Sequence, residues 1–247
     1  VRPGGHAHPH GHPAEGRAGM IPGLLAAIAV FSYLLGGLNG AIIASKYVFH
    51  RDVRDYDSGN AGLTNFYRTF GAPGLAIVIG TDVLKTVIAV VAGGLIMGTQ
   101  GAAATGQVFA GFCVMLGHIY PVFYGFRGGK GLACLAGVLL SFDWRLFLVF
   151  LGAEAVIVLV TDYICFVPMT ASVAFTAVYA VLTKNALGTL VFTVTTLAIL
   201  FRHFENLKRI KSGDEAHFSL LWKRQEEVKR IGLEEEDRKW QARNKHK

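Results

Sequence analysis

The sequence predicts an all-α membrane protein, a polytopic bundle of about seven transmembrane helices with re-entrant or cytoplasmic-face polar loops. Of its 247 residues, 52% are apolar and only 17% are charged, whereas soluble domains carry about 25% charged residues. Charged residues are scarce between Gly71 and Leu200 and crowd towards the two ends of the chain. This composition excludes a disordered chain and a small disulfide-stapled scaffold, and it argues against a soluble enzyme.

Apolar stretches recur along the chain at lengths that suit a lipid bilayer. A transmembrane helix needs roughly 17–25 apolar residues, and shorter ones are tolerated when other protein covers them. We expect seven spans, of which the fourth is too short to cross alone. They are residues 21–47, 73–97, 106–124, 132–141, 144–160, 166–182 and 187–201.

The two ends differ in composition from the span-rich middle. Residues 1–19 are rich in Gly, Pro and His, and we expect a disordered segment, with Met20 as a natural start before the first apolar run. Its alternating histidines would also suit a metal-binding tail. Residues 20–217 form the predicted transmembrane domain. Residues 218–247 form a predicted charged cytoplasmic tail, either docked on the anionic leaflet or solvated.

Loop charges predict the orientation. Most loop Lys and Arg residues follow the odd-numbered spans or lie in the C-terminal tail, so these segments should face the cytoplasm of a multi-pass protein of the inner (plasma) membrane. The formal charge of +7 then reflects basic loops beside anionic lipid, and we expect no nucleic-acid partner. The three cysteines, Cys113, Cys134 and Cys165, match no metal or redox spacing and should be buried small hydrophobes.

A first polar cluster follows the first span. Its small residues let the backbone turn, and consecutive N–H groups in such a turn form an anion-binding concavity. Hydroxyl and amide side chains add donors, and arginines can bind phosphate through paired hydrogen bonds. The alternative is a flexible polar loop. The candidate phosphate-binding residues here are Arg54, Ser58, Gly59, Asn60, Gly62, Thr64, Asn65 and Arg68.

A second cluster follows the third span. Glycines frame Lys130 ahead of a predicted helix, an arrangement that suits a phosphate cradle, although glycines also serve close helix packing in lipid. It is not a P-loop, because Tyr124 and Gly131 stand where that motif needs Gly and Ser or Thr. The candidates are His118, which could equally be an interior histidine bonded to backbone, and Arg127, Gly128, Gly129, Lys130 and Gly131.

A third cluster closes the last span. On a helix, His203 and Asn206 share a face, which a simple basic stop signal does not require. Arg202 and Glu205 flank them. Inside the second span, Asp82 and Lys85 are costly in lipid, so they either neutralise each other or serve a site.

In order and spacing, these motifs resemble the bacterial integral-membrane glycerol-3-phosphate acyltransferases that use acyl phosphate, the PlsY family, over roughly residues 21–216. The chain departs from the family pattern at several positions: Asp57 replaces a Gly, Phe204 replaces an Arg, and Gly36-Gly37-Leu38-Asn39 replaces Gly-Ser-Ile-Pro. The stretch that contains a Ser in the family corresponds to residues 163–168 of this chain, which include Cys165. The matching motifs are Asp52-Val53-Arg54, Ser58 to Asn65, Asp82-Val83-Leu84-Lys85, Gly117-His118-Ile119-Tyr120-Pro121, Phe126 to Gly131, and Arg202-His203-Phe204-Glu205-Asn206.

The resemblance implies transfer of a fatty acyl group from acyl phosphate to the 1-hydroxyl of glycerol 3-phosphate, with lysophosphatidate and phosphate as products. It makes residues 20–217 an acyltransferase domain that needs no cofactor and no metal and works beside membrane lipid. The implied catalytic residues are Ser58, Asn60, His203 and Asn206; Lys85 joins the phosphate-binding set, and Asp82, His118, Arg202 and Glu205 support the site. Either His203 or a substrate phosphate oxygen would act as the base.

Two other classes compete with this interpretation. His50 and Asp55 have the His-x-x-x-x-Asp spacing of a different acyltransferase class, but the phosphate motif that follows in that class is absent. A membrane transporter or channel for a phosphorylated solute would need polar groups at the midplane and on the opposite face, where the sequence offers few.

Overall fold

The computed structural model describes residues 13–234, and within them every regular element is a helix. The prediction of an all-α polytopic bundle is confirmed. The elements are α1 (Pro13–Gly36), α2 (Gly40–Val48), η1 (Val53–Asp55), α3 (Leu63–Phe70), α4 (Leu75–Gly98), α5 (Ala103–Ile119), η2 (Val122–Tyr124), α6 (Leu132–Phe142), α7 (Trp144–Thr161), α8 (Phe166–Thr183), α9 (Ala186–Ser212), η3 (Phe218–Leu221) and α10 (Arg224–Arg230).

Six segments of the described chain are long and apolar enough to cross a membrane, so the protein is a multi-pass membrane protein. The count is one below the expected seven, because α6 has only 11 residues, as its short apolar run already suggested. The six are Met20–Val48, Leu75–Gly98, Ala103–Tyr124, Trp144–Thr161, Phe166–Thr183 and Ala186–Ser212.

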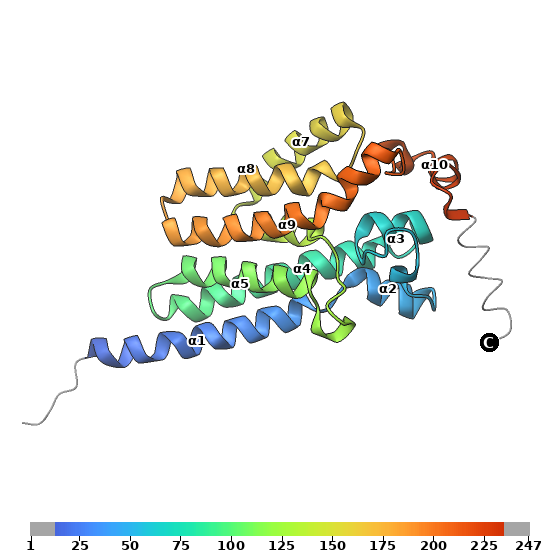
Figure 1. The fold of residues 1–247 in the computed structure, drawn as a ribbon. Coiled ribbons are helices and arrows are strands. Elements are labelled where there is room, and N and C mark those ends of the chain that lie inside the picture. Colours follow the sequence, from blue (N-terminus) through green and yellow to red (C-terminus); the bar gives the residue numbers. More distant parts are fainter. Residues whose placement is uncertain (1–12, 235–247) are drawn as a thin grey trace, which may run out of the picture.

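The long helices form two layers (Figure 1). Helices α1, α4 and α5 pack together in one layer, α7, α8 and α9 in the other, and α5 contacts α9 across them. The short α6 packs against α4, α5, α7 and α8. Helices α4 and α5 approach closely at Gly93 and Gly106: a Cβ at Gly93 would lie 2.5 Å from the Gly106 carbonyl oxygen.

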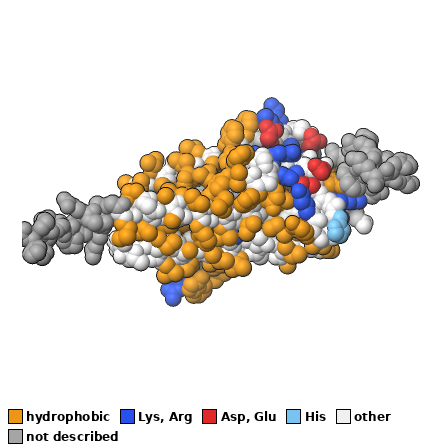
Figure 2. Space-filling view, turned by 90° about the horizontal axis from the view of Figure 1, so that it is seen from below, with side chains coloured by type: hydrophobic (Ala, Val, Ile, Leu, Met, Phe, Trp, Pro, Cys, Tyr) orange, Lys and Arg blue, Asp and Glu red, His pale blue; other side chains and the backbone are white. Residues whose placement is uncertain are grey.

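One end of the bundle carries the polar segments. Helices α2, α3 and α10 lie together there, beside the C-terminal end of α9 (Figure 1). Figure 2 shows hydrophobic side chains over the body of the molecule and most of the visible acidic and basic side chains gathered at that end. The first, second and third polar clusters of the sequence therefore lie together in space, as their one-sided distribution in the sequence predicts.

Helix α9 reaches from the apolar body into this polar end over 27 residues. Asn185 caps its start, because the Asn185 side chain accepts from the Gly188 N–H, and Gly213 caps its end in a left-handed conformation, the usual helix stop. Residues 1–12 and 235–247 lie outside the described residues. Helix α1 begins at Pro13, within the segment expected to be disordered, and η3 and α10 lie in the expected charged tail.

Candidate active site

The loop between α2 and α3 is shaped by the side chain of Asn65. Its Nδ2 group donates hydrogen bonds to the carbonyls of Asn60 (2.9 Å), Val53 (3.1 Å) and Tyr56 (3.2 Å). Gly59 adopts φ +65°, a left-handed conformation that favours glycine. Asn65 thus folds the loop back on itself and holds Ser58, Gly59 and Asn60 in a hydrogen-bonded turn.

This loop contacts the glycine-rich segment before α6. The Ala61 N–H donates to the carbonyl of Gly128 (3.3 Å), and a Cβ at Gly129 would lie 2.8 Å from the Ala61 carbonyl oxygen. Asn39 binds the same carbonyl oxygen of Ala61, because its Nδ2 donates to it (3.0 Å). The Oδ1 of Asn39 accepts from the Ile42 N–H and caps α2. The glycines at 128 and 129 are therefore required where two backbones approach each other.

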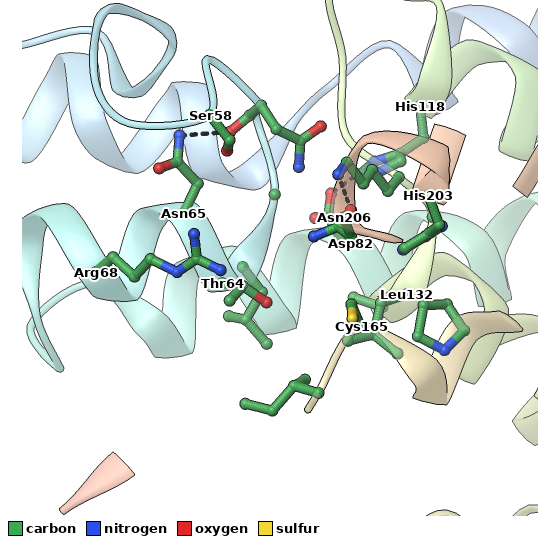
Figure 3. Close-up of a pocket in the computed structure, with 18 of the residues that line it drawn as sticks. Ser58, Thr64, Asn65, Arg68, Asp82, His118, Leu132, Cys165, His203 and Asn206 are labelled. Atoms are coloured by element: carbon green, nitrogen blue, oxygen red, sulfur yellow. Dashed lines mark hydrogen bonds and ion pairs between the residues drawn. The ribbon is translucent and has the colours of Figure 1, made fainter. Parts of the chain in front are cut away.

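Helix α9 completes the site. The Lys130 ammonium donates a hydrogen bond to Oδ1 of Asn206, which joins the glycine-rich segment to α9. Around this contact lies a cavity, here called the inner cavity (Figure 3). Its polar lining residues are Ser58, Asn60, Thr64, Asn65, Arg68, Asp82, His118, Lys130, His203, Asn206 and Glu215, and the remaining ones are Gly62, Leu63, Gly131, Leu132, Ala133, Ile164, Cys165 and Pro168.

His203 is buried and lines the inner cavity. Its Nδ1 lies 2.8 Å from the carbonyl oxygen of Ile199, one turn earlier in α9. Because a carbonyl only accepts, the hydrogen on the ring must sit on Nδ1, and Nε2 of the neutral ring keeps its lone pair. The imidazole is thus oriented by the backbone and offers an acceptor nitrogen.

A second recess, here called the outer pocket, adjoins the inner cavity. The two share Ser58, Asn60 and Lys130. Arg127 and Arg202 line the outer pocket, and neither pairs with an acidic side chain within residues 13–234. The remaining outer-pocket residues are Gly59, Phe126, Gly128, Glu205 and Arg209.

Lys130 is the cation common to both recesses. Burial lowers the pKa of its ammonium to about 8; the carboxylate of Glu215 opposes this shift, and the positive charges of Arg202 and Arg68 add to it. Its hydrogen-bond partner is a neutral amide, so its charge is not cancelled by direct contact with a carboxylate. An incoming anion would relieve the repulsion among these cations.

Arg68 has a different environment, because it belongs to a closed ring of two arginines and two acids. Its guanidinium donates to Asp57 (2.6 Å) and Glu215 (2.7 Å). Arg209 faces the same two carboxylates, at 2.6 Å and 3.4 Å. The ring joins the α2–α3 loop, α3, the end of α9 and the segment that follows it, and two of its members, Arg68 and Glu215, line the inner cavity.

The ring explains why Asp stands at position 57. Asp57 adopts φ +49°, a left-handed conformation that Asp tolerates better than most residues. Burial opposes ionisation of its carboxyl, but the guanidinium groups of Arg68 and Arg209 outweigh burial and hold its pKa below the ordinary value. The negative charge of Asp57, which stands where the family has Gly, is therefore neutralised by Arg68 and Arg209.

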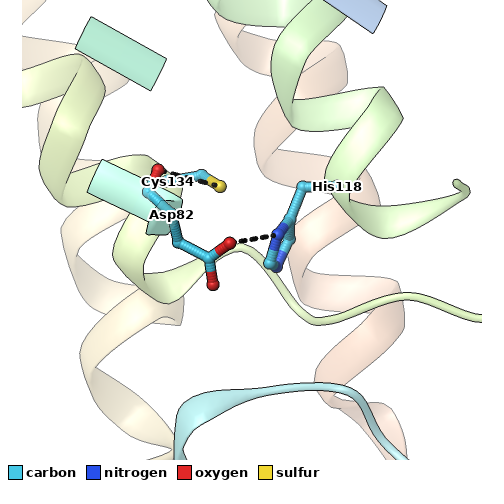
Figure 4. A group of neighbouring side chains, drawn as sticks. All are labelled: Asp82, His118 and Cys134. Carbon is cyan, nitrogen blue, oxygen red and sulfur yellow. Dashed lines mark hydrogen bonds and ion pairs between the residues drawn. The ribbon is translucent and has the colours of Figure 1, made fainter. Parts of the chain in front are cut away.

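Asp82 and His118, which line the inner cavity, form a buried group with Cys134 whose potential metal ligands lie within 4.8 Å of one another (Figure 4). The Lys85 ammonium lies beside them, 2.7 Å from the Asp82 carboxylate and 3.1 Å from Nδ1 of His118. A resident cation thus already balances Asp82. Of the two roles considered for this pair, neutralisation is observed, and Asp82 also lines the inner cavity.

Most candidate residues from the sequence meet at the two recesses, and three do not. Arg54 is held by both carboxylate oxygens of Asp52 (2.9 and 2.7 Å) and by the Tyr124 carbonyl (2.8 Å). Lys85 lies behind the inner cavity, and Gly129 serves the backbone approach described above. Glu205 lines the outer pocket and pairs with Lys208 (2.9 Å).

Sequence reasoning did not assign roles to Arg209 and Glu215, which complete the ring. Gly213 and Glu215, which follow the basic end of the last span, were a visible pattern in the sequence. Nothing in that pattern identified Asp57 as the distant partner. Cys165 lines the inner cavity in the stretch where the family has Ser. All three cysteines are buried and free, which confirms that expectation.

The fold and the site define a polytopic membrane protein that presents a cation-lined double recess at one end of its helical bundle. The chain belongs to the glycerol-3-phosphate acyltransferase family, whose sequence profile matches residues 26–213. Membership makes it an acyltransferase, as the motif resemblance implied.

Individual relatives agree with this assignment. A glycerol-3-phosphate acyltransferase of Lactiplantibacillus plantarum is 34% identical over 203 residues, which cover 81% of this chain and 96% of the relative. One from a Thermoanaerobacter species is 38% identical over 189 residues, covering 76% and 92%. The crystal structure of PlsY (YgiH), an integral membrane glycerol 3-phosphate acyltransferase in its glycerol 3-phosphate form, is 30% identical with a TM-score of 0.70, covering 80% of this chain and 96% of that chain. Its lysophosphatidic acid form is 28% identical with a TM-score of 0.67, covering 83% and 97%.

Proposed function

We propose that this protein transfers a fatty acyl group from acyl phosphate to the 1-hydroxyl of glycerol 3-phosphate. The products are 1-acyl-glycerol 3-phosphate, which is lysophosphatidate, and inorganic phosphate, in the first acylation of phospholipid biosynthesis. Residues 20–217 form the catalytic domain, and residues 218–247 form a cytoplasmic tail. The Lys and Arg residues at the polar end favour a cytoplasmic site in the inner (plasma) membrane.

One observation carries the proposal: two adjoining recesses share Ser58, Asn60 and Lys130. Acyl phosphate and glycerol 3-phosphate each bear a phosphate, and the acyl carbon must meet the hydroxyl between them. A single recess would suit one anion, whereas two recesses with a common wall suit two. The similar structures of PlsY in glycerol 3-phosphate and lysophosphatidic acid forms support this substrate and this product.

The two phosphates are assigned to different partners. The Ser58–Asn65 turn and the wall that contains Arg68 hold one, in the inner cavity. Lys130 and Arg127 hold the other, at the outer pocket, with Arg202 beside them. Backbone N–H groups of a fixed turn and cations without acidic partners are the usual means of binding phosphate. The acyl chain extends from the site between the apolar helices, beside membrane lipid.

The reaction needs no enzyme nucleophile, because phosphate is a good leaving group. The 1-hydroxyl oxygen attacks the acyl carbonyl carbon, the bond between that carbon and the phosphate oxygen breaks, and inorganic phosphate departs. Holding both reactants in attack geometry supplies roughly 7–11 kcal/mol of the barrier. Side-chain donors at Ser58 and Asn60 are suited to the developing oxyanion, at about 3–4 kcal/mol each.

Nε2 of His203 takes the proton of the hydroxyl. The hydrogen bond from Nδ1 to the Ile199 carbonyl leaves Nε2 as an acceptor, and both His203 and Asn206 line the inner cavity. Asn206 holds Lys130 in place until a phosphate arrives. In the alternative, a phosphate oxygen of the substrate takes the proton and His203 with Asn206 positions it. Asp82 and His118, which also line the inner cavity, support the site.

The test is an assay of detergent-purified protein supplied with glycerol 3-phosphate and one of three acyl donors in parallel: acyl phosphate, acyl-CoA or acylated acyl carrier protein. We expect lysophosphatidate and inorganic phosphate in equal amounts when acyl phosphate is the donor, and no product with the other two donors. Product formed only from a thioester donor would contradict the proposed donor. A protein that moves a phosphorylated solute across vesicles without forming product would be a transporter instead.

A further inference from the structure

The C-terminal segment from Ala216 to Leu233 folds against the site, although it lies beyond the part of the chain that matches the family. Four of its residues form a small apolar core: Ala216, Leu220, Val228 and Leu233. Tyr67 of α3 packs against this core, and its hydroxyl donates to the Leu221 carbonyl (3.1 Å). The segment is therefore anchored on α3, the helix that carries Arg68.

Arg224, the first residue of α10, binds the end of α3. Its guanidinium donates to the carbonyls of Arg68 (2.7 Å), Tyr67 (3.0 Å) and Thr69 (3.0 Å). The last carbonyls of a helix lack partners within the helix, and a cation there is also favoured by the helix dipole. Arg224 thus fixes the backbone of Arg68 itself.

Arg230, the last residue of α10, binds the other side of the ring. It donates to the carbonyls of Glu215 (2.6 Å) and Gly213 (2.5 Å), and Glu227 orients its guanidinium (2.9 Å). Arg68 and Glu215 form the buried ion pair on the wall of the inner cavity, at 2.7 Å. The two ends of one short helix therefore hold the backbones of the two partners in that pair.

We propose that α10 is a two-point brace in which Arg224 and Arg230 are positioning residues for the Arg68–Glu215 wall of the inner cavity. The brace sets the position of the Arg68–Glu215 wall and so tunes the affinity for the phosphate held in the inner cavity, which this proposal assigns to glycerol 3-phosphate. This inference rests on the proposed function. Neither arginine lines the inner cavity or the outer pocket, so neither contacts substrate there.

The test compares Arg224→Met and Arg230→Met with Lys229→Met in the full chain. Lys229 is exposed in the same helix, and its side chain makes no hydrogen bond or ion pair with the described residues. We expect each arginine variant to raise the KM for glycerol 3-phosphate by roughly three- to thirtyfold, with kcat and the KM for the acyl donor within twofold. The Lys229 variant should match the wild type.

Coupling separates positioning from general stability. In a Glu215→Gln background the wall is already loosened, so Arg230→Met should raise KM by less than twofold further. Arg224→Lys, which keeps the charge and a donor, should restore part of the affinity and serves if the Met variant does not fold. A lowered Tm with unchanged KM in both variants, or a full KM effect of Arg230→Met in the Glu215→Gln background, would overturn the brace. Wild-type protein that forms no lysophosphatidate would instead overturn the proposed function.

Discussion

The ammonium of Lys130 donates a hydrogen bond to the side-chain oxygen of Asn206, across 76 positions of the chain. This contact closes the site, and it leaves the lysine charge available. Arg68, by contrast, already faces two carboxylates. A phosphate that enters has only to displace a neutral amide from Lys130, which costs far less than separating a buried ion pair.

Lys130→Ala should weaken binding of the phosphate-bearing substrates. A hydrogen bond to a charged group contributes about 1.5–3 kcal/mol, which corresponds to roughly a 10- to 150-fold rise in KM or an equal fall in kcat/KM. Lys211→Ala, which changes an exposed lysine at the end of α9, is the matched control. Normal kinetics in the Lys130 variant, with the protein inserted in membranes, would remove this residue from the site.

The same lysine predicts a pH dependence. The pKa of Lys130 is lowered to about 8, and the protonated form binds phosphate. The values of kcat/KM for the phosphate-bearing substrates should therefore be full below pH 8 and fall as the pH rises through it. In Lys130→Arg the guanidinium stays charged, so any remaining activity should lose this basic limb. Identical profiles of wild type and variant above pH 8 would contradict the assignment.

His203→Ala should lower kcat by about 10²–10⁴-fold if Nε2 takes the proton. A loss below tenfold would leave His203 only a positioning role and give the proton to a substrate phosphate. His50→Asn is the control, because His50 is exposed and adopts φ +53°, which Asn tolerates. Unchanged activity in that variant also excludes a His50–Asp55 pair as the catalytic dyad.

Asp57→Asn should destabilise the protein at neutral pH, because Asn tolerates the left-handed backbone but removes a charge that faces Arg68 and Arg209. Breaking a buried ion pair costs about 3 kcal/mol or more. The folded-state pKa of Asp57 is lowered, so its stabilisation is present above the unfolded pKa and is lost as the pH falls through the folded value. The Tm difference in detergent should shrink accordingly in acid. The exposed Asp55→Asn should change Tm little at any pH.

Gly106→Ala should lower the Tm, because a Cβ there would collide with the backbone of α4 at Gly93. Gly80→Ala, in α4, is the matched control: its Cβ would meet nothing within 4 Å, so the protein should keep its stability or gain about 0.5–1 kcal/mol. Equal Tm values for the two variants would show that the α4–α5 contact is not tight in solution.

Local patterns in the sequence were enough for the helical bundle, its six long spans and the convergence of three polar clusters, although the short fourth run was counted as a seventh span. Apolar length identifies spans, and side chains such as Ser58, Lys130 and His203 are conspicuous because a loop or a span does not otherwise require them. The ring was beyond the reach of such reasoning, since Asp57 meets Arg209 across 152 positions and Arg68 meets Glu215 across 147. Likewise, no local signal in the sequence distinguishes Arg54, which forms an ion pair with Asp52, from Lys130, which bonds to a neutral amide.

The shortness of α6 bears on the surrounding bilayer. Its 11 residues at about 1.5 Å each reach about 16 Å, roughly half of a typical hydrocarbon core. Immediately after it, Trp144 and Arg145 are exposed and face each other at 5.5 Å, a pair typical of the headgroup region. Helices α4, α5, α7 and α8 pack against α6, so protein covers a segment that is too short to face lipid along a whole span.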